Sequence, residues 1–251
     1  MGSSGANDWL VPAGRRVIVT GARGGIGRAA VELLEDAGCS VAGCDVDDFD
    51  VRDRAAVDAG TGALVDRLGG CDAVVANAGV VDTIHRAERF PDADWQTDLQ
   101  TNLTGQFNVI RALFEPLRES GDGRVVVTSS ASSETGLPGQ VAYTAAKAGL
   151  VGMARTLAAE WGRHGIRCNV VMPGLIGTPK VMALPEAVRT AMSRTLPLGR
   201  IGEPAELAGT IAFLLSPAAA YITGTVIRVD GGYGLNTMSL AAPGADSRTR
   251  A

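Results

Sequence analysis

The chain has 251 residues and a formal net charge of −4, with 46% apolar and 20% charged residues. These are ordinary values for a globular protein that buries a sizeable core, in one large α/β domain or two small ones. Acidic and basic residues are interspersed without a basic run, which argues against a nucleic acid or a membrane surface as partner.

Six short apolar runs alternate with longer segments of helical periodicity. The predicted strands are residues 15–20, 40–45, 72–79, 124–130, 166–174 and 225–232. The predicted helices are residues 26–38, 54–68, 94–120, 141–165, 185–194 and 204–215. Strands that alternate with helices in this way form right-handed βαβ units. The sequence therefore predicts an α/β fold with a doubly wound parallel sheet, flanked by helices on both faces, in a single domain.

Three segments need a separate interpretation. Residues 1–14 have no charged region followed by an apolar run, so we expect a flexible leader and not a secretion signal. Residues 237–251 are small and polar, which predicts a disordered tail and leaves residues 15–236 as the catalytic domain of a cytoplasmic protein. Residues 207–227 are uncharged over a length that could cross a bilayer. Pro217 and Gly224 interrupt that run, so a helix, a loop and a strand are expected instead.

The first predicted strand runs into a glycine-rich loop. The spacing T-G-x-x-x-G-x-G extends from Thr20 to Gly27 and opens the first helix. Glycine lets a backbone turn sharply and approach a pyrophosphate, whose charge is stabilised at a helix N-terminus. The loop predicts a dinucleotide site, and a glycine-rich turn without a nucleotide is the alternative. The residues expected to contact the cofactor here are Gly21, Arg23, Gly24, Gly25 and Ile26.

Asp45 ends the second predicted strand, 18 residues after Gly27. A carboxylate there can accept hydrogen bonds from the adenosine ribose and would repel a 2′-phosphate. Arg23 is the competing signal, because its guanidinium could pair with that phosphate. Two like charges about 4 Å apart repel by several kcal/mol at an effective dielectric constant of about 20. We therefore expect NAD(H) to be preferred over NADP(H).

Lysine is scarce, at Lys147 and Lys180 alone, and Lys147 follows one of three tyrosines, Tyr143, by four residues. Residues i and i+4 share a helix face, so the ammonium can reach the phenol. A phenol with a pKa near 10 is a poor acid–base group at neutral pH, and a neighbouring ammonium favours its ionised form. The pair, helped by the positive charge of an oxidised nicotinamide, predicts that Tyr143 carries a proton.

Together these motifs resemble those of the short-chain dehydrogenase/reductase family, over residues 16–232. The resemblance implies a single Rossmann-type domain whose cofactor crosses the sheet where the strand order switches. ANAG at residues 76–79 is similar to a family turn, with alanine in place of its first asparagine. The resemblance implies further cofactor contacts from that turn, from a pair that holds the adenine and from a segment that meets the nicotinamide carboxamide. These are Asn77, Ala78 and Gly79; Asp50 and Val51; and Ile176 and Thr178.

The resemblance also implies a catalytic set of Asn102, Ser130, Tyr143 and Lys147. Ser130 would orient the substrate oxygen, and Lys147 would hydrogen-bond the nicotinamide ribose. Asn102 would hold a water that links Lys147 to solvent. Other serines lie near the same strand end, so Ser130 is favoured by its register thirteen residues before Tyr143. They are Ser129, Ser132 and Ser133.

The chain departs from the family pattern between Asp45 and Asp50, which are separated only by VDDF. Most members place a helix there, so we expect a mere turn and a more exposed adenine side. The substrate pocket should be walled by residues 80–85, 132–138 and 179–196, the last acting as a mobile lid. Its apolar candidates are Val181, Met182, Leu184 and Met192.

The histidines and cysteines give little support to a metal site or to a different set of catalytic residues. His85 is a candidate either for the pocket or for the surface, and His164 is expected to be exposed near a helix C-terminus. The cysteines lack metal-ligand spacing, so we expect buried thiols in a reducing cytosol and no metal site. They are Cys39, Cys44, Cys71 and Cys168.

The leading hypothesis is an oxidoreductase that transfers a hydride between NAD(H) and a small secondary alcohol or ketone. A second is a 3-oxoacyl-thioester (acyl-carrier-protein) reductase or another biosynthetic enzyme using NADPH, with Arg189, Arg194 and Arg200 near the pocket mouth. A non-catalytic dinucleotide sensor is a third, although the presence of both Tyr143 and Lys147 argues against it. The resemblance implies a homodimer or homotetramer.

Overall fold

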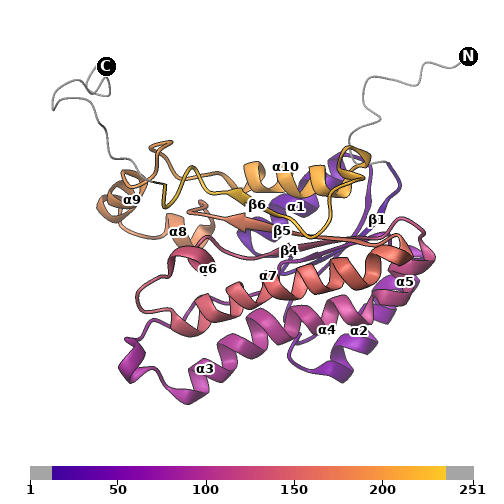
Figure 1. Ribbon diagram of the computed structural model, residues 1–251, viewed down its shortest axis with the longest axis horizontal. Coiled ribbons are helices and arrows are strands. Elements are labelled where there is room, and N and C mark those ends of the chain that lie inside the picture. The colour runs from indigo at the N-terminus through magenta and orange to yellow at the C-terminus, as the bar shows by residue number, and fades with distance from the viewer. Residues whose placement is uncertain (1–12, 236–251) are drawn as a thin grey trace, which may run out of the picture.

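A computed structural model describes residues 13–235, and the predicted leader and tail lie outside this range except for residues 13 and 14 (Figure 1). Six parallel strands form one sheet in the order β2-β1-β3-β4-β5-β6. The strands are β1 (Arg16–Thr20), β2 (Ser40–Cys44), β3 (Ala73–Ala76), β4 (Arg124–Thr128), β5 (Arg167–Pro173) and β6 (Val226–Val229). The doubly wound parallel sheet is thus confirmed.

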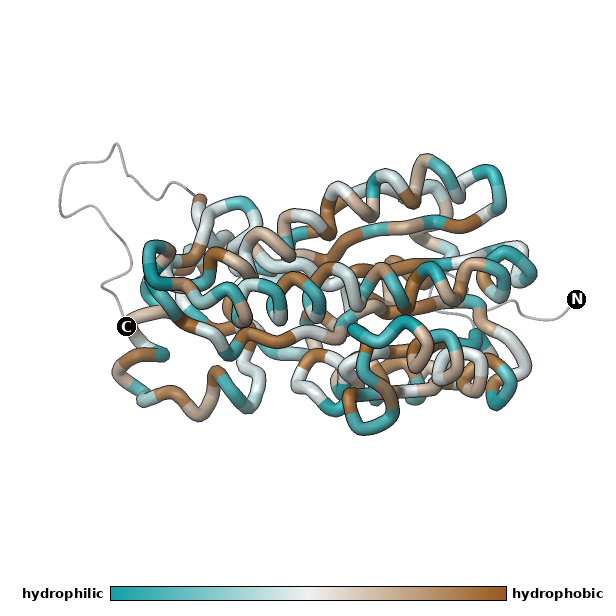
Figure 2. The backbone as a smooth tube through the Cα atoms, turned by 90° about the horizontal axis from the view of Figure 1, so that it is seen from below, coloured by the Kyte–Doolittle hydropathy of each residue, from teal (hydrophilic) through white to brown (hydrophobic). Residues whose placement is uncertain are grey.

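Two helical layers cover the sheet (Figure 1). One contains α1 (Gly25–Asp36) and α10 (Pro204–Leu215), whose Leu34 and Ile211 pack on Val19 and Val75. The other contains α2 (Arg54–Leu68), α4 (Gln106–Ala112), α5 (Phe114–Glu119) and α7 (Val141–Trp161). Because both faces are buried, the inner strands consist of continuous apolar runs. Figure 2 views the second layer from outside and shows hydrophobic and hydrophilic residues mixed along its helices.

The predicted helix over residues 94–120 is interrupted, which corrects the expectation of one long helix. The structure has α3 (Asp92–Leu99), a π-helix (Gln100–Gly105), α4 and α5, with a break at Leu113. Pro116 explains the break, because it has no N–H to bond the carbonyl of Ala112 and its ring crowds that carbonyl. The sequence shows no corresponding signal for the π-helix, a rare feature that is often found at functional sites.

Residues 45–53 form only turns, as expected from the short spacing between Asp45 and Asp50. The crossover from β2 to β3 is not bare, since α2 follows directly at Arg54. No strand lies beyond β2, which is the edge of the described sheet. The side of the site next to β2 is therefore open.

Residues 207–227 form the predicted helix, loop and strand, as α10, a 3₁₀ turn at Pro217–Ala219 and β6. None of the helices among residues 13–235 is long and apolar enough to span a bilayer. Three short helices are also present: α6 (Ser132–Thr135), α8 (Pro179–Met182) and α9 (Glu186–Ser193). Of these, only α9 was predicted.

Candidate active site

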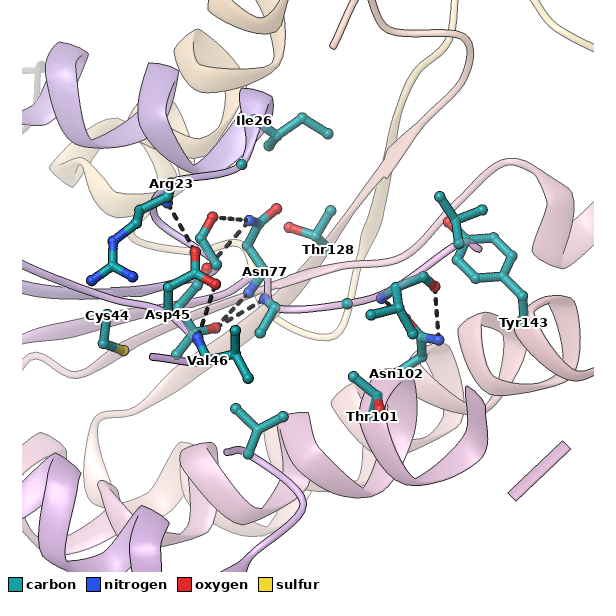
Figure 3. Close-up of a pocket in the computed structure, with 18 of the residues that line it drawn as sticks. Arg23, Ile26, Cys44, Asp45, Val46, Asn77, Thr101, Asn102, Thr128 and Tyr143 are labelled. Atoms are coloured by element: carbon teal, nitrogen blue, oxygen red, sulfur yellow. Dashed lines mark hydrogen bonds between the residues drawn. The ribbon is translucent and has the colours of Figure 1, made fainter. Parts of the chain in front are cut away.

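A cavity of about 590 Å³ lies at the carboxyl ends of β1 to β4. It begins beside Arg23 and Asp45 and ends at Tyr143, so it crosses the point where the strand order switches (Figure 3). This point is where open α/β sheets bind ligands. The predicted cofactor and catalytic residues line it, except Ser130 and Ile176. They are Gly21, Arg23, Gly24, Gly25, Ile26, Asp45, Asp50, Val51, Asn77, Ala78, Gly79, Asn102, Tyr143, Lys147 and Thr178.

The glycine loop leaves no room for side chains. Gly21 has a φ of 64°, which disfavours other residues, and a Cβ there would lie 3.0 Å from Cα of Ala78. A Cβ on Gly27 would overlap the carbonyl of Gly21, and one on Gly25 would meet Thr178 at 3.0 Å. The loop thus passes close to its neighbours and exposes the N-terminus of α1. This backbone cradle fits a dinucleotide pyrophosphate.

Arg23 and Asp45 do not oppose each other in the way that we anticipated. The Arg23 guanidinium donates to Asp47 at 2.7 Å and to Asp48 at 3.1 Å. The Asp45 carboxylate accepts the backbone N–H groups of Arg23, at 3.0 Å, and Val46, at 2.9 Å (Figure 3). The arginine is therefore neutralised by neighbouring acids, while the Asp45 carboxylate is fixed at the end of β2.

Thr20 joins the glycine loop to the turn after β3. Its hydroxyl accepts the backbone N–H groups of Asn77 and Ala78, both at 3.0 Å. The Asn77 amide donates back to the carbonyls of Thr20 and Gly21 (Figure 3). Thr20 lines the cavity but was not among the predicted cofactor residues. Its place at the end of a buried strand, directly before the glycines, was the available signal.

Asn102 lies fully buried in the π-helix, and its amide is used by the loop after β3. It donates to the carbonyl of Val80 and accepts the N–H of Val80, both at 3.0 Å (Figure 3). Since both polar atoms of the amide are engaged, the side chain fixes this loop. The water-holding role of Asn102 stays a prediction.

The serines after β4 have separate tasks. Ser129 is buried and donates to the backbone carbonyl of Lys147 at 2.7 Å, which ties β4 to α7. Ser130 accepts a hydrogen bond from the Ser132 hydroxyl at 3.0 Å, and hydrogen bonding by Ser130 lowers the pKa of Tyr143. Ser130 is thus the hydroxyl beside Tyr143. Ser132, which we considered only as a rival, supports it.

Lys147 is buried, and its ammonium donates to the carbonyl of Thr128 at 2.9 Å. Burial lowers the pKa of Lys147 from 10.5 to about 8, because the charged form loses its hydration. The nitrogen lies 5.7 Å from the centre of the Tyr143 ring. The two side chains therefore share one end of the cavity, as their spacing predicts.

The pKa of Tyr143 differs from our expectation. Burial raises it above 10, the hydrogen bond with Ser130 lowers it, and the negative charge of Asp98 raises it again. The net shift is upward, so the side chains around the phenol favour the protonated form. The expected lowering would have to come from the bound oxidised nicotinamide.

The two expected adenine residues lie at the open end of the cavity. Asp50 is paired with Arg52 at 2.6 Å, which lowers the pKa of the Asp50 carboxyl. The Val51 carbonyl accepts from Asn108 at 3.0 Å. At the other end, Thr178 caps α8, whereas Ile176 is buried in a bridge to Gly202 and its side chain does not line the cavity.

A second cavity of about 420 Å³ adjoins Ser130. Its lining agrees with the predicted walls at Ser132, Leu137, Met192 and Leu196, and also includes Tyr233 and residues 173–175, which we did not predict. Val181, Met182 and Leu184 do not line it. His85 lies on the surface, where it contacts Asp94 at 2.9 Å.

All four cysteines are buried, as expected of apolar thiols. Within residues 13–235, no group of three or more His, Cys, Asp or Glu side chains could hold a metal ion.

Comparison with known proteins points to one family. Residues 48–234 match a family model described as enoyl-(acyl carrier protein) reductase. The chain is 38% identical to an acetoacetyl-CoA reductase of Synechocystis sp., with 86% of this chain and 95% of that protein covered. It is 35% identical to a 3-oxoacyl-[acyl-carrier-protein] reductase of Vibrio cholerae, covering 87% and 97%. The crystal structure of a levodione reductase superposes with a TM-score of 0.82, at 34% identity, covering 88% of this chain and 97% of that one.

Proposed function

Because the chain belongs to the short-chain dehydrogenase/reductase family, we propose that Tyr143 is the proton carrier of an oxidoreductase that interconverts secondary alcohols and ketones. The observation that carries this proposal is the position of the Tyr143 hydroxyl. Ser130, whose hydrogen bonding lowers the pKa of Tyr143, borders the second cavity, while Tyr143 itself lines the first. A substrate oxygen between these hydroxyls would face both a proton source and the nicotinamide end of the first cavity.

In the proposed reaction each of these residues has a separate role. A bound nicotinamide would supply or accept the hydride. In reduction, the Tyr143 hydroxyl donates its proton to the substrate oxygen, and Ser130 holds that oxygen by a hydrogen bond. Lys147 hydrogen-bonds the ribose and stabilises the phenolate that remains. Asn102 fixes the loop that closes this end of the cavity, through Val80.

Replacement of Tyr143 by phenylalanine tests the proposed role. Tyr143→Phe should bind NADH with a dissociation constant within about threefold of wild type, because the ring remains, yet lose more than about 99% of turnover. Tyr221→Phe is the matched control, since Tyr221 is fully exposed and should be silent. If Tyr143→Phe kept more than about a tenth of the activity, another group would have to carry the proton.

The cofactor is a nicotinamide dinucleotide, and we propose that it is NAD(H). Asp45 supports this preference, since it is anchored at the end of β2 and would face a 2′-phosphate. The pairing of Arg23 with two acids removes the competing signal. Asp50 and Val51 would hold the adenine, and Ile176 would reach the carboxamide through its backbone while Thr178 lines the cavity.

The proposed NAD(H) preference predicts a change of specificity on neutralising Asp45. Asp45→Asn should reduce the ratio of kcat/KM for NADH to that for NADPH by roughly tenfold or more, because the repulsion is removed. Asp58→Asn is the control, since Asp58 pairs with Arg54 on α2 and does not line the cavity. Equal use of both cofactors by the wild-type enzyme would show that the assignment is wrong.

A 3-oxoacyl-thioester reductase is the second candidate, and the names of two relatives favour it. The basic residues that we expected near the pocket mouth give it less support. Arg200 is paired with Glu206 at 2.6 Å, and Arg189 donates to the backbone carbonyl of Met182. Assays with acetoacetyl-CoA and with small cyclic diketones, each run with NADH and with NADPH and followed by absorbance, would separate the two candidates.

We propose that the enzyme is a cytoplasmic homodimer or homotetramer. The buried thiols fit a reducing compartment. The outer face of α7 is lined by small residues that would let another helix approach closely. They are Ala145, Ala148, Gly152 and Ala159, all exposed in the single chain.

A further inference from the structure

One face of α3 and the π-helix fastens the loop after β3 at three successive points. Asp94, Asp98 and Asn102 follow one another at intervals of four residues, which places them on one face. Asp94 contacts His85 at 2.9 Å, Asp98 accepts the Thr83 hydroxyl at 2.6 Å, and Asn102 binds Val80. We call residues 94, 98 and 102 the loop-fastening row.

Asp98 differs from its neighbours in the loop-fastening row. It is fully buried, whereas Asp94 is partly exposed. Its Oδ2 accepts from Thr83, but its Oδ1 has no partner within the described residues. A buried carboxylate oxygen without a hydrogen bond or a cation is destabilising by about 1–3 kcal/mol or more. An apolar residue at this position would destabilise the fold less. The carboxylate is therefore expected to have a function other than stabilising the fold.

The position of Asp98 suggests that role. α3 packs against α7, which carries both Tyr143 and Lys147. Thr97 and Thr101, on either side of Asp98 in the sequence, line the cavity together with Tyr143. The Thr83 hydroxyl prevents the carboxylate from turning away, and its charge raises the pKa of Tyr143. Asp98 therefore opposes the effect that the ammonium of Lys147 would have.

The charged groups of the loop after β3, and Lys147 on α7, are already engaged. Lys147, on the same helix, donates to the carbonyl of Thr128. On the loop, Asp82 pairs with Lys180 of α8, and His85 pairs with Asp94. Among residues 13–235, Asp98 makes no salt bridge, so its field is not cancelled by a direct partner.

We propose that Asp98 is a positioning residue whose fixed negative charge keeps Tyr143 protonated and so extends the pH range over which the enzyme reduces ketones. The inference rests on the proposed role of Tyr143 as proton carrier. The equilibrium of the reaction is unchanged. Reduction, which needs the phenol, stays fast to higher pH, and oxidation, which needs the phenolate, begins only at higher pH.

The small number of tyrosines makes a direct test possible. Ionisation of Tyr143, Tyr221 and Tyr233 can be followed by the ultraviolet absorbance of tyrosinate, and the step lost in Tyr143→Phe identifies Tyr143. In the wild type, Tyr143 should ionise above pH 10, because burial raises its pKa. In Asp98→Asn, which can still accept from Thr83, the Tyr143 step should move to lower pH by about one pH unit. The pH profile of kcat for alcohol oxidation should move in the same direction.

Asp92→Asn is the matched control, since Asp92 is an exposed carboxylate on the same helix and should move neither curve. A purely structural Asp98 would alter the melting temperature or KM but leave the ionisation step in place, and that result overturns the proposal. If Asp98→Asn does not fold, Asp98→Ser takes its place, and a Tyr143 ionisation step that stays at the wild-type pH overturns the proposal. The titration measures ionisation and not turnover. A wrong role for Asp98 would therefore show in the titration, whereas a wrong role for Tyr143 would show as activity retained by Tyr143→Phe.

Discussion

Lys147 holds an ammonium group where water does not reach it, and the position affects stability as well as chemistry. Its pKa of about 8 lies below the 10.5 of an unfolded chain, so the unfolded state binds the proton more tightly. The destabilising effect is fully present below about pH 8 and disappears as the pH rises toward 10.5. A difference of this size corresponds to about 3 kcal/mol, an order-of-magnitude value. The residue that we propose assists the phenol is therefore one that the fold would be more stable without.

Lys147→Met tests this destabilising effect of the buried ammonium group. The free energy of unfolding of the variant, relative to wild type, should be most favourable at neutral pH and should fall by about 3 kcal/mol as the pH rises from about 8 to about 10.5. Urea unfolding at several pH values measures the difference. Lys180→Met is the control, because Lys180 is largely exposed. A difference that is independent of pH over this range would mean that folding does not lower the pKa of Lys147.

Two glycines that lie in helices differ in whether the surrounding structure requires them. Gly27, in the first turn of α1, has no room for a Cβ because the carbonyl of Gly21 occupies that place. Gly209, in the middle of α10, has open space around it. Glycine weakens a helix by about 1 kcal/mol relative to alanine when nothing requires its small size. Only the first glycine is therefore expected to serve the cofactor site.

Alanine at these two positions should have opposite effects. Gly27→Ala should reduce dinucleotide affinity by at least about tenfold, because the loop must move away from the pyrophosphate position. Gly209→Ala should raise the free energy of unfolding by about 0.5–1 kcal/mol and leave affinity unchanged. Calorimetric titration with NADH and chemical unfolding measure the two effects. Normal affinity in Gly27→Ala would place the pyrophosphate elsewhere.

The sequence predicted those elements whose ends carry local signals. Residues 54–68 were predicted as a helix and form α2 with the same bounds, since Asp53 caps its first turn and Gly69 adopts the left-handed conformation after its last. α6 and α8 span only four residues each, too few to show a periodicity. The π-helix depends on tertiary packing, in which Gly105 lies against Val51. No local sequence pattern predicts it.

The site was predicted to a similar extent. Tyr143, Lys147 and the glycines were found because their spacing alone implies a shared face or a tight turn. Arg23 was found as well, but not its pairing with Asp47 and Asp48, which depends on how the turn after β2 folds. The contact between Asp98 and Thr83 joins segments that periodicity cannot align. Sequence patterns report local geometry, whereas these contacts arise only when the segments pack.

At the scale of the whole molecule, the outer layer of α7 and its neighbours is the proposed place of assembly (Figure 1). The exposed small residues of α7 would allow close contact between helices from two copies. Isologous contacts of this kind form closed dimers, which can pair further into tetramers. The proposed assembly would cover the helix that bears Tyr143 and leave the open side next to β2 uncovered.

A bulky charge on α7 should disrupt that assembly. Gly152→Arg should reduce the mass measured by light scattering at micromolar concentration, because a guanidinium would have to be buried between the helices. The space around Gly152 is open in the single chain, so its fold should tolerate the change. Gly62→Arg on α2 is the control, since Gly62 is equally unobstructed. A wild-type protein that scatters as a monomer would refute the proposed assembly itself.

The two lysines have a practical consequence. Lys147 is buried, whereas Lys180 is largely exposed on α8 and pairs with Asp82. Amine-selective reagents would therefore find a single side chain to modify, apart from the α-amino group of the chain. A fluorophore attached to that amine would sit on α8, whose capping residue Thr178 lines the cavity. Its emission could follow cofactor arrival and departure in real time, with no need to engineer a labelling site.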